Sequence, residues 1–205
     1  AYLPDLRGVD LRLTTRGLQA DAADAQLSHV LDRLEPVVEP WRFHATSGDI
    51  VESVSGALRS RRMRLATAES CTAGLIATRL TDLPGASEIF VGGVVAYENA
   101  VKQALLEVPE DMLVRHGAVS EAVAVQMATG VARSLAADVG VAVTGIAGPG
   151  GGTDEKPVGT VWLAVSGLGR PTSEHIRFVG DRQAVRERAA QAAFALLLRS
   201  LQPRP

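Results

Sequence analysis

The sequence contains a single cysteine, Cys71, among 205 residues. One cysteine can form no intrachain disulfide and cannot supply the paired thiolates of a zinc site, and both facts suit a reducing cytoplasm. No metal-ligand spacing of His, Cys, Asp and Glu occurs, so neither a metal nor another cofactor is predicted. No apolar run approaches the roughly 18 residues of a membrane span, and no signal peptide is visible. We therefore predict a cytoplasmic protein that does not enter a membrane.

Aromatic residues and net charge are also scarce, at 4% of the chain and -2. A duplex-binding domain normally gathers a strongly basic face, so nucleic acid is not expected as a partner. With 46% hydrophobic and 21% charged residues, the composition is that of an ordinary globular protein. The length leaves room for one domain of about 150 residues and a small appendage. Because position 1 is Ala, we expect the chain to be a piece of a longer protein.

The first 48 residues predict a small α+β unit. Val9–Leu13 alternates apolar and polar side chains, which is typical of a half-buried strand. The stretch Asp21–Leu34 places leucines and a valine at helical spacing, and Trp41–Ala45 has β character. So short a unit has too little core to be stable alone, and we expect it to lean on a neighbour.

Residues 49–205 show a different pattern, in which apolar strands alternate with long helices. A helix over Ile50–Arg61 follows the turn at Ser47–Asp49. Strands are then predicted at residues 65–68, 90–96, 139–144, 159–165 and 174–179, and helices at 71–80, 99–106, 120–136 and 181–201. Such alternation predicts an α/β fold, a three-layer α/β/α sandwich with helices on both faces of a sheet.

Ser70 is a candidate nucleophile because it lies among small residues where a strand gives way to a helix. Unpaired backbone N–H groups and the positive end of the helix dipole at such a turn could stabilise an oxyanion. A serine here could equally be a helix N-cap, which the local sequence alone favours. Cys71 is a third possibility, since a helix N-terminus lowers thiol pKa, although a free cysteine is more often a small buried hydrophobe.

A serine nucleophile needs a base. The four histidines are His29, His44, His116 and His175. None has a carboxylate neighbour at a telling position, so a Ser/His/Asp arrangement is weakly supported. Lys102 is the alternative, because burial can make a lysine amine a base, and the nearby Tyr97 hydroxyl could relay or orient the proton. On spacing alone, a surface lysine in the first turn of a helix is favoured.

A glycine-rich segment, Thr144–Lys156, separates two predicted strands. It lacks the Lys-Ser/Thr ending of a phosphate-binding P-loop, and a strand follows it where a nucleotide fingerprint would require a helix. Its backbone amides could still approach a phosphate or carboxylate closely. The alternative is a mobile connector.

Taken together, these blocks resemble the carboxy-terminal domain of CinA, the nicotinamide-nucleotide amidase family also called PncC. The matching stretches are Thr67–Gly74, Val95–Asn99 with Lys102, His116–Glu121, Thr144–Pro149, Glu155–Val161 and Gly180–Arg182. They run in family order across residues 50–201. The first fifty residues are similar to the small linking domain of full-length CinA, and the larger domain that precedes it in that architecture, similar to molybdopterin-binding proteins, is not in this chain.

The resemblance implies hydrolysis of nicotinamide mononucleotide to nicotinate mononucleotide and ammonia, without metal or organic cofactor. It implies Ser70 as nucleophile, Lys102 as base and Tyr97 as its partner, in a homodimer. The implied substrate-binding residues are Glu69, Thr72, Asn99, Thr144, Gly145, Ala147, Gly148 and Arg182. Two other functions stay open: a non-catalytic binding protein linked to competence or recombination, and a serine hydrolase acting on a different small amide.

Overall fold

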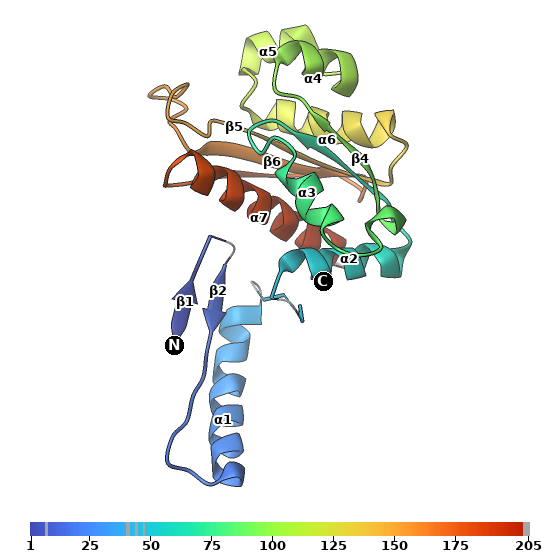
Figure 1. Ribbon diagram of the computed structural model, residues 1–205. Coiled ribbons are helices and arrows are strands. Elements are labelled where there is room, and N and C mark those ends of the chain that lie inside the picture. Colours follow the sequence, from blue (N-terminus) through green and yellow to red (C-terminus); the bar gives the residue numbers. More distant parts are fainter. Residues whose placement is uncertain (7, 40–41, 44, 47, 203–205) are drawn as a thin grey trace.

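Figure 1 presents the computed structural model, which describes residues 1–6, 8–39, 42–43, 45–46 and 48–202. Its centre is a mixed sheet of five strands. They are β3 (Leu65–Glu69), β4 (Phe90–Val95), β5 (Val139–Gly145), β6 (Thr160–Ser166) and β7 (Thr172–Arg177), hydrogen-bonded in the order β4-β3-β5-β6-β7. β3 runs parallel to β4 and β5, whereas β6 and β7 continue the sheet antiparallel. All five predicted strands are confirmed, with β7 beginning two residues earlier than expected.

Two layers of helices enclose this sheet and complete the predicted three-layer sandwich (Figure 1). One face is covered by α2 (Ile50–Arg61), α3 (Leu75–Thr81) and α7 (Arg182–Leu201). The other is covered by α4 (Asn99–Leu106), α5 (Glu110–His116) and α6 (Glu121–Ser134). The sequence pattern missed α5 and the short 3-10 helix Ala86–Glu88, because one or two turns are too short to display a helical period.

The two faces of the sheet differ in side-chain size. On β5, Val139, Val141 and Val143 face α7, while Gly140 and Ala142 face α6. Alternation along a strand produces this separation. Small residues let α6 lie close to the sheet: a Cβ on Gly140 would be 2.0 Å from the carbonyl oxygen of Ala128. The backbone of α6 therefore lies directly against the backbone of β5, and this close contact restricts the position of α6.

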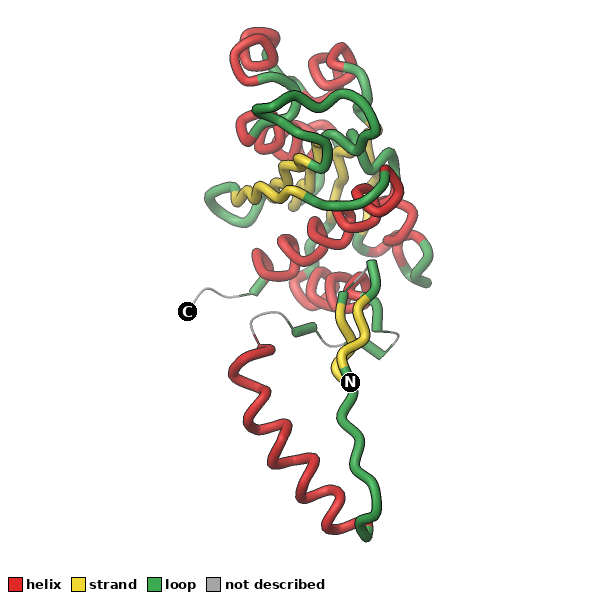
Figure 2. Tube along the Cα trace, turned by 90° about the vertical axis from the view of Figure 1, so that its left-hand side faces the viewer, coloured by secondary structure: helices red, strands yellow, loops and turns green. Residues whose placement is uncertain are grey.

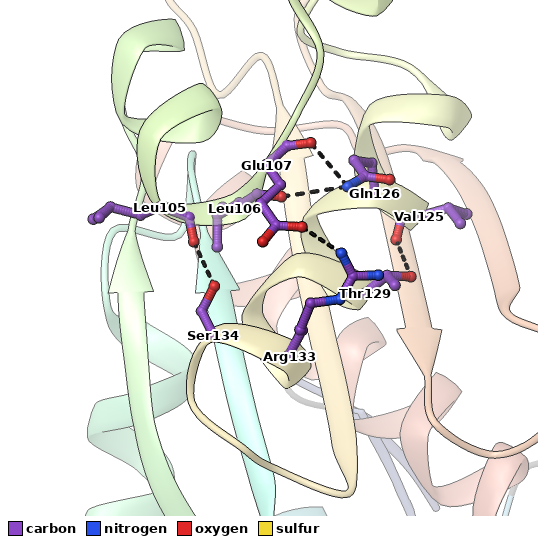
Figure 3. A network of polar contacts seen from close by, with 8 residues as sticks. All are labelled: Leu105, Leu106, Glu107, Val125, Gln126, Thr129, Arg133 and Ser134. Carbon is purple, nitrogen blue, oxygen red and sulfur yellow. Dashed lines mark hydrogen bonds and ion pairs between the residues drawn. The ribbon is translucent and has the colours of Figure 1, made fainter.

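The end of α4 is fixed to α6 by polar contacts (Figure 3). Gln126 Nε2 donates to the carbonyl oxygen of Glu107 at 2.9 Å, and Ser134 Oγ donates to that of Leu105 at 2.8 Å. Arg133 forms an ion pair with the Glu107 side chain. The Gln126 and Ser134 side chains pair carbonyls that the end of a helix leaves unsatisfied. They hold α4, and every side chain on it, in a defined place over the sheet.

The amino-terminal segment lies beyond one end of the sandwich in both views (Figures 1 and 2). It consists of an antiparallel hairpin, β1 (Tyr2–Pro4) and β2 (Val9–Leu11), followed by α1 (Ala20–Val38). No described residue of α1 is fully buried. The buried core of the protein begins at Ile50, the first residue of α2.

Two expectations for this segment were wrong. The strand at Val9 ends at Leu11, and it is exposed throughout where a half-buried strand was predicted, because no second layer covers it. Of the predicted strand at 41–45, Trp41 and His44 lie outside the described residues, while Arg42, Phe43 and Ala45 belong to no strand. The predicted helix from Asp21 is confirmed, and it continues to Val38 through Pro36.

The contact between α4 and α6 gives a test of the packing. A Cβ on Gly130 of α6 would lie 2.0 Å from the carbonyl oxygen of Leu106. Gly130→Ala should therefore lower the free energy of unfolding by about 3 kcal/mol, because backbone must move to admit the methyl group. Urea denaturation measures the change.

Gly56→Ala is the matched control, since Gly56 lies within α2 and a Cβ there meets nothing within 4 Å. That substitution should raise the free energy of unfolding by about 0.5–1 kcal/mol, the helix propensity difference. Equal effects at the two positions would contradict the close approach of α4 and α6.

Candidate functional site

The candidate residues gather where the three parallel strands end. The chain leaves β3 for β4 through α3 on one face and returns to β5 through α4, α5 and α6 on the other. Connections that depart to opposite faces leave a crevice at the carboxyl ends of the strands, which is where open α/β sheets bind ligands. Residues 70–74, 96–98 and 146–159 form this edge.

Ser70 is the first residue after β3. Its N–H donates to the carbonyl oxygen of Val143 at 2.9 Å, which extends the pairing of β3 with β5 by one residue. The residue is 9% exposed, and its hydroxyl has no hydrogen-bond partner among the residues that the structure describes. The N-cap of α3 is Gly74, so the interpretation of Ser70 as a helix cap is wrong. The helix predicted from Cys71 begins four residues later, at Leu75.

Glu69, not Ser70, caps α3 with its side chain. Glu69 Oε2 accepts from the N–H of Ile76 at 3.1 Å, and Oε1 accepts from that of Ala77 at 2.9 Å. A carboxylate at a helix N-terminus satisfies unpaired donors and interacts favourably with the helix dipole. Both oxygens of this buried carboxylate are thereby committed to α3.

Lys102 is almost completely buried, with 1% of its surface exposed. Its Nζ donates to the carbonyl oxygens of Ala96 at 2.8 Å and Tyr97 at 3.2 Å. Burial lowers the pKa of this amine, and the opposing effects of Glu98 and of charge on Cys71 are smaller. The surface interpretation of Lys102 is therefore wrong. Burial makes the uncharged amine, the form that can accept a proton, easier to reach than on an exposed lysine.

The sheet register brings Ser70 beside the Lys102 amine. Glu69 pairs with Val95, and the N–H of Ala96 donates to the carbonyl oxygen of Glu69 at 2.8 Å, so Ser70 is next to Ala96. Neighbouring strands lie about 4.8 Å apart. Lys102 Nζ is bound to the carbonyl of Ala96, so the amine and Ser70 share this residue as a neighbour.

Alternation along β3 puts both groups on one face of the sheet. Ala66 and Ala68 face α6 and pack in the same cluster as Leu106 of α4. Ser70 is two residues beyond Ala68 and keeps the β3–β5 ladder, so its side chain follows the same face. Lys102 is buried on α4, which covers this face.

Tyr97 contacts Lys102 through its backbone and not through its hydroxyl. The hydroxyl accepts from Arg182 Nη2 at 2.7 Å, and Arg182 Nη1 donates to the carbonyl oxygen of Gly148 at 2.8 Å. The predicted hydroxyl-to-amine contact is absent among the described residues. Arg182 instead links the end of β4 to the glycine-rich loop.

The glycine-rich segment is anchored at its base. Thr144 Oγ1 donates to the carbonyl oxygen of Ala118 at 2.8 Å, and the Ile146 N–H donates to that of Thr160 at 2.8 Å. A Cβ on Gly145 would lie 3.0 Å from Cys71 Sγ, so the start of this segment adjoins the turn after Ser70. The mobile-connector interpretation does not hold for this anchored part. Ala147 is buried and Gly148 has a positive φ, next to the Arg182 contact.

The remaining predicted residues differ in exposure. Asn99, the first residue of α4, is exposed beside Tyr97. Thr72 is fully buried in the turn after Ser70, and its hydroxyl has no hydrogen-bond partner among the described residues. Cys71 is buried, and desolvation raises its pKa to about 12. The thiolate is the nucleophilic form, so a thiol that stays protonated is poorly suited to attack.

Arg186 is a residue of this site that the sequence reasoning missed. Its Nε donates to the carbonyl oxygen of Cys71 at 3.2 Å, and its Nη2 donates to that of Thr72 at 2.9 Å. Arg182 and Arg186 are four residues apart on α7, a spacing that puts both on one side of a helix and could have drawn attention to the pair. They border a cavity of about 280 Å³ with Leu75, Gln183 and Glu187.

The described residues lack the features of two other kinds of protein. They contain no cluster of three or more His, Cys, Asp or Glu side chains suited to a metal ion. No helix among them has the length and apolar character needed to span a membrane.

The fold and site define an α/β sandwich with an unpaired serine hydroxyl and a buried lysine near the carboxyl ends of parallel strands. Residues 48–201 match the family model of the CinA C-terminal domain. The chain belongs to this family.

Comparisons with individual proteins agree with the family. The chain is 43% identical over 200 residues to a CinA-like protein of Gemmatimonas aurantiaca, covering 98% of this chain and 47% of that protein. It is 45% identical over 205 residues to a CinA-like protein of Salinibacter ruber, covering 98% and 48%. The chain thus spans about half the length of the curated relatives it matches.

Solved structures match the sandwich. A competence-damaged protein (CinA) superfamily protein from Klebsiella pneumoniae superimposes with a TM-score of 0.72 at 39% identity, covering 74% of this chain and 95% of that one. A CinA superfamily protein from Escherichia coli gives a TM-score of 0.72 at 34% identity, covering 80% and 98%.

The buried lysine predicts a particular pH dependence of stability. Its folded-state pKa lies below the ordinary 10.5, so between these values the unfolded chain binds more protons than the folded one. Stability contributed at Lys102 therefore rises as pH increases toward 10.5 and falls as pH decreases. The unfolding free energy of wild type minus that of Lys102→Met should increase over this window, as measured by urea denaturation at a series of pH values.

A difference between wild type and Lys102→Met that stays constant over this window would contradict the burial of the Lys102 amine.

Proposed function

We propose that this protein hydrolyses nicotinamide mononucleotide to nicotinate mononucleotide and ammonia, with Ser70 as nucleophile and Lys102 as general base. The observation that carries the proposal is the nearly complete burial of Lys102, whose amine binds the carbonyl of Ala96, the residue whose N–H pairs with Glu69 directly before Ser70. Membership of the CinA family is consistent with it, because the amidase is the activity that the sequence motifs imply. No metal or organic cofactor takes part in the proposed reaction.

In the first half of the reaction, uncharged Lys102 Nζ accepts the hydroxyl proton as Ser70 Oγ bonds to the carboxamide carbon of the substrate. The negative charge of the tetrahedral intermediate is stabilised by N–H groups of the turn that follows Ser70. The carbon–nitrogen bond then breaks, and the departing nitrogen takes the proton from Lys102 and leaves as ammonia. An ester on Ser70 remains.

In the second half, a water molecule loses a proton to Lys102 and attacks the ester carbon. The bond to Ser70 Oγ breaks, Oγ regains a proton from Lys102, and nicotinate mononucleotide is released. Since every proton passes through one amine, the reaction requires that amine to change charge readily, which burial promotes.

The rim of the site has groups suited to an anionic substrate. Arg182 is exposed at the start of α7, with its guanidinium between the Tyr97 hydroxyl and the Gly148 carbonyl. In the proposal, the carbonyl of Tyr97 holds the Lys102 amine, and the hydroxyl of Tyr97 holds Arg182. Arg182, Asn99 and the backbone from Thr144 to Gly148 line the nucleotide side, whereas the buried Thr72 supports the turn behind it, and a homodimer in the cytoplasm is the proposed form.

Loss of the nucleophile tests the proposal. Ser70→Ala should reduce ammonia release from nicotinamide mononucleotide more than about 1000-fold, because no covalent intermediate can form. Ser60→Ala is the matched control, since the exposed Ser60 hydroxyl bonds only within α2, and its activity should equal that of wild type. Folded wild-type protein that releases no ammonia from this substrate would refute the proposal.

The same assay distinguishes the other two functions. Activity on nicotinamide or other small amides in preference to the ribose phosphate would indicate a serine hydrolase of different specificity. No hydrolysis of any amide would favour a non-catalytic role, which the competence-related names of solved relatives suggest.

The base can be tested through the pH profile. Because only the uncharged amine accepts a proton, kcat/KM should rise with pH and level off above the pKa of Lys102, which burial places below the ordinary 10.5. Lys102→Met should remove both the activity and this rising limb. A wild-type profile that is flat across neutral and alkaline pH would exclude Lys102 as the base.

A further inference from the structure

We infer that Lys156 is a positioning residue that fastens the glycine-rich loop, residues 146–159, across the carboxyl ends of the parallel strands. The inference rests on the proposed function for its substrate and goes beyond it in naming the side chain that holds the nucleotide side of the site in place. It is carried by one contact between the loop and the end of α5, and by where that contact lies relative to Thr144 and Gly148.

Lys156 binds the end of α5 with its ammonium group. Nζ donates to the carbonyl oxygen of His116, the last residue of this helix, at 2.6 Å. The last carbonyls of a helix lack partners within it, and lysine side chains are suited to bind them. A Cβ on Gly117 would lie 3.2 Å from Nζ, so the glycine that follows the helix leaves room for the ammonium.

This contact is the outer attachment of the loop. Residues 149–155 are exposed, and the bonds between Thr153 and Lys156 lie within the loop itself. Among the residues that the structure describes, the bond from Lys156 to His116 is the one hydrogen bond that joins residues 149–156 to another element. A single side chain therefore attaches the outer part of the loop by hydrogen bonding.

The inner part of the loop is attached from the other layer of helices. Arg182 of α7 donates to the carbonyl oxygen of Gly148 at 2.8 Å. α7 and α5 pack on opposite faces of the sheet. The loop, held by α7 at Gly148 and by α5 at Lys156, thus passes from one face to the other across the edge where β3 ends.

The connection to which Lys156 attaches the loop is itself fixed beside the site. Three consecutive carbonyls at this connection each accept from a side chain, namely His116 from Lys156, Gly117 from Ser120 and Ala118 from Thr144. Thr144 directly follows Val143, whose carbonyl binds the Ser70 N–H. Lys156 therefore holds the loop to a support whose place is set by the strand beside Ser70.

A loop that is already fastened can bind the nucleotide side of a substrate without first being ordered. Ordering a loose segment during binding costs free energy and lowers affinity. The contacts that place Ser70 and Lys102 lie on β3, β4 and β5, outside the loop. Lys156 should therefore affect the binding of substrate and leave the chemical step nearly unchanged.

Lys156→Met tests the inference in the full chain. The variant should raise KM for nicotinamide mononucleotide about tenfold and keep kcat within about threefold, since the interactions lost are made equally in the ground state and the transition state. Lys156→Arg keeps a charged donor and should remain within about threefold of wild type in KM. Arg115→Met is the matched control, because Arg115 is next to His116 and its side chain binds Asp111 within α5. Its KM and kcat should equal those of wild type.

A second measurement reports on the loop without any substrate. The protease Glu-C cleaves after acidic residues, and Asp154 and Glu155 are exposed at the tip of the loop. Cleavage of a segment that opens locally follows the population of the open form, so Lys156→Met should be cut at the tip about tenfold faster than wild type. Lys156→Arg and Arg115→Met should be cut at the wild-type rate, with the cleavage site identified by mass spectrometry.

The two measurements separate this inference from the proposed function. Faster cleavage at the tip of Lys156→Met, with no nucleotide hydrolysis by wild type, would leave the fastening role intact and refute the substrate. A raised KM with unchanged cleavage would overturn the inference, because Lys156 would then bind substrate directly. An unchanged KM in folded, active Lys156→Met would also overturn it, whatever the rate of cleavage.

Discussion

The burial of one amine is the constraint on which the candidate site depends. Lys102 has backbone carbonyls as its partners, and a carbonyl stabilises an ammonium less than a carboxylate does. Had either acceptor been an acidic side chain, the amine would be held in its charged form. The choice of partners therefore matters as much as the burial, and the strand end that supplies them is the one that lies beside Ser70.

The surrounding architecture can be understood as support for this pair. On one face, α6 rests on glycine and alanine and fixes the end of α4, which sets the depth of Lys102. On the other, α7 reaches the turn after Ser70 with Arg186 and the loop at Gly148 with Arg182. The two helical layers on opposite faces of the sheet thus meet the same edge, one through the proposed base and one through the turn after the proposed nucleophile.

Residue patterns predicted the sheet and the long helices because periodicity is a local property. The alternation around Val141 and the helical spacing in α6 and α7 were sufficient. The seven-residue α5 carried too short a pattern, and the exposure of β2 could not be foreseen, since burial depends on what packs against a strand.

The site was harder to predict because its contacts join distant parts of the chain. Ser70 looked like a helix cap until the reach of the Glu69 carboxylate was known, and Lys102 looked like a surface residue until α6 was placed over the sheet. Arg186 is 114 residues from Thr72. One clue was available: the chain has two lysines against 19 arginines, and only lysine can act as a neutral base when buried.

The adjacency of Glu69 and Ser70 has a consequence for the tolerance of this gene to change. The Glu69 side chain binds the start of α3 on one face of the sheet, and the Ser70 side chain lies on the opposite face. One step along the strand therefore separates the two roles. Inserting or deleting one codon within β3 would exchange them, placing a carboxylate next to the amine and a hydroxyl beneath the helix. Point changes along β3 leave that frame intact, whereas a change in its length does not.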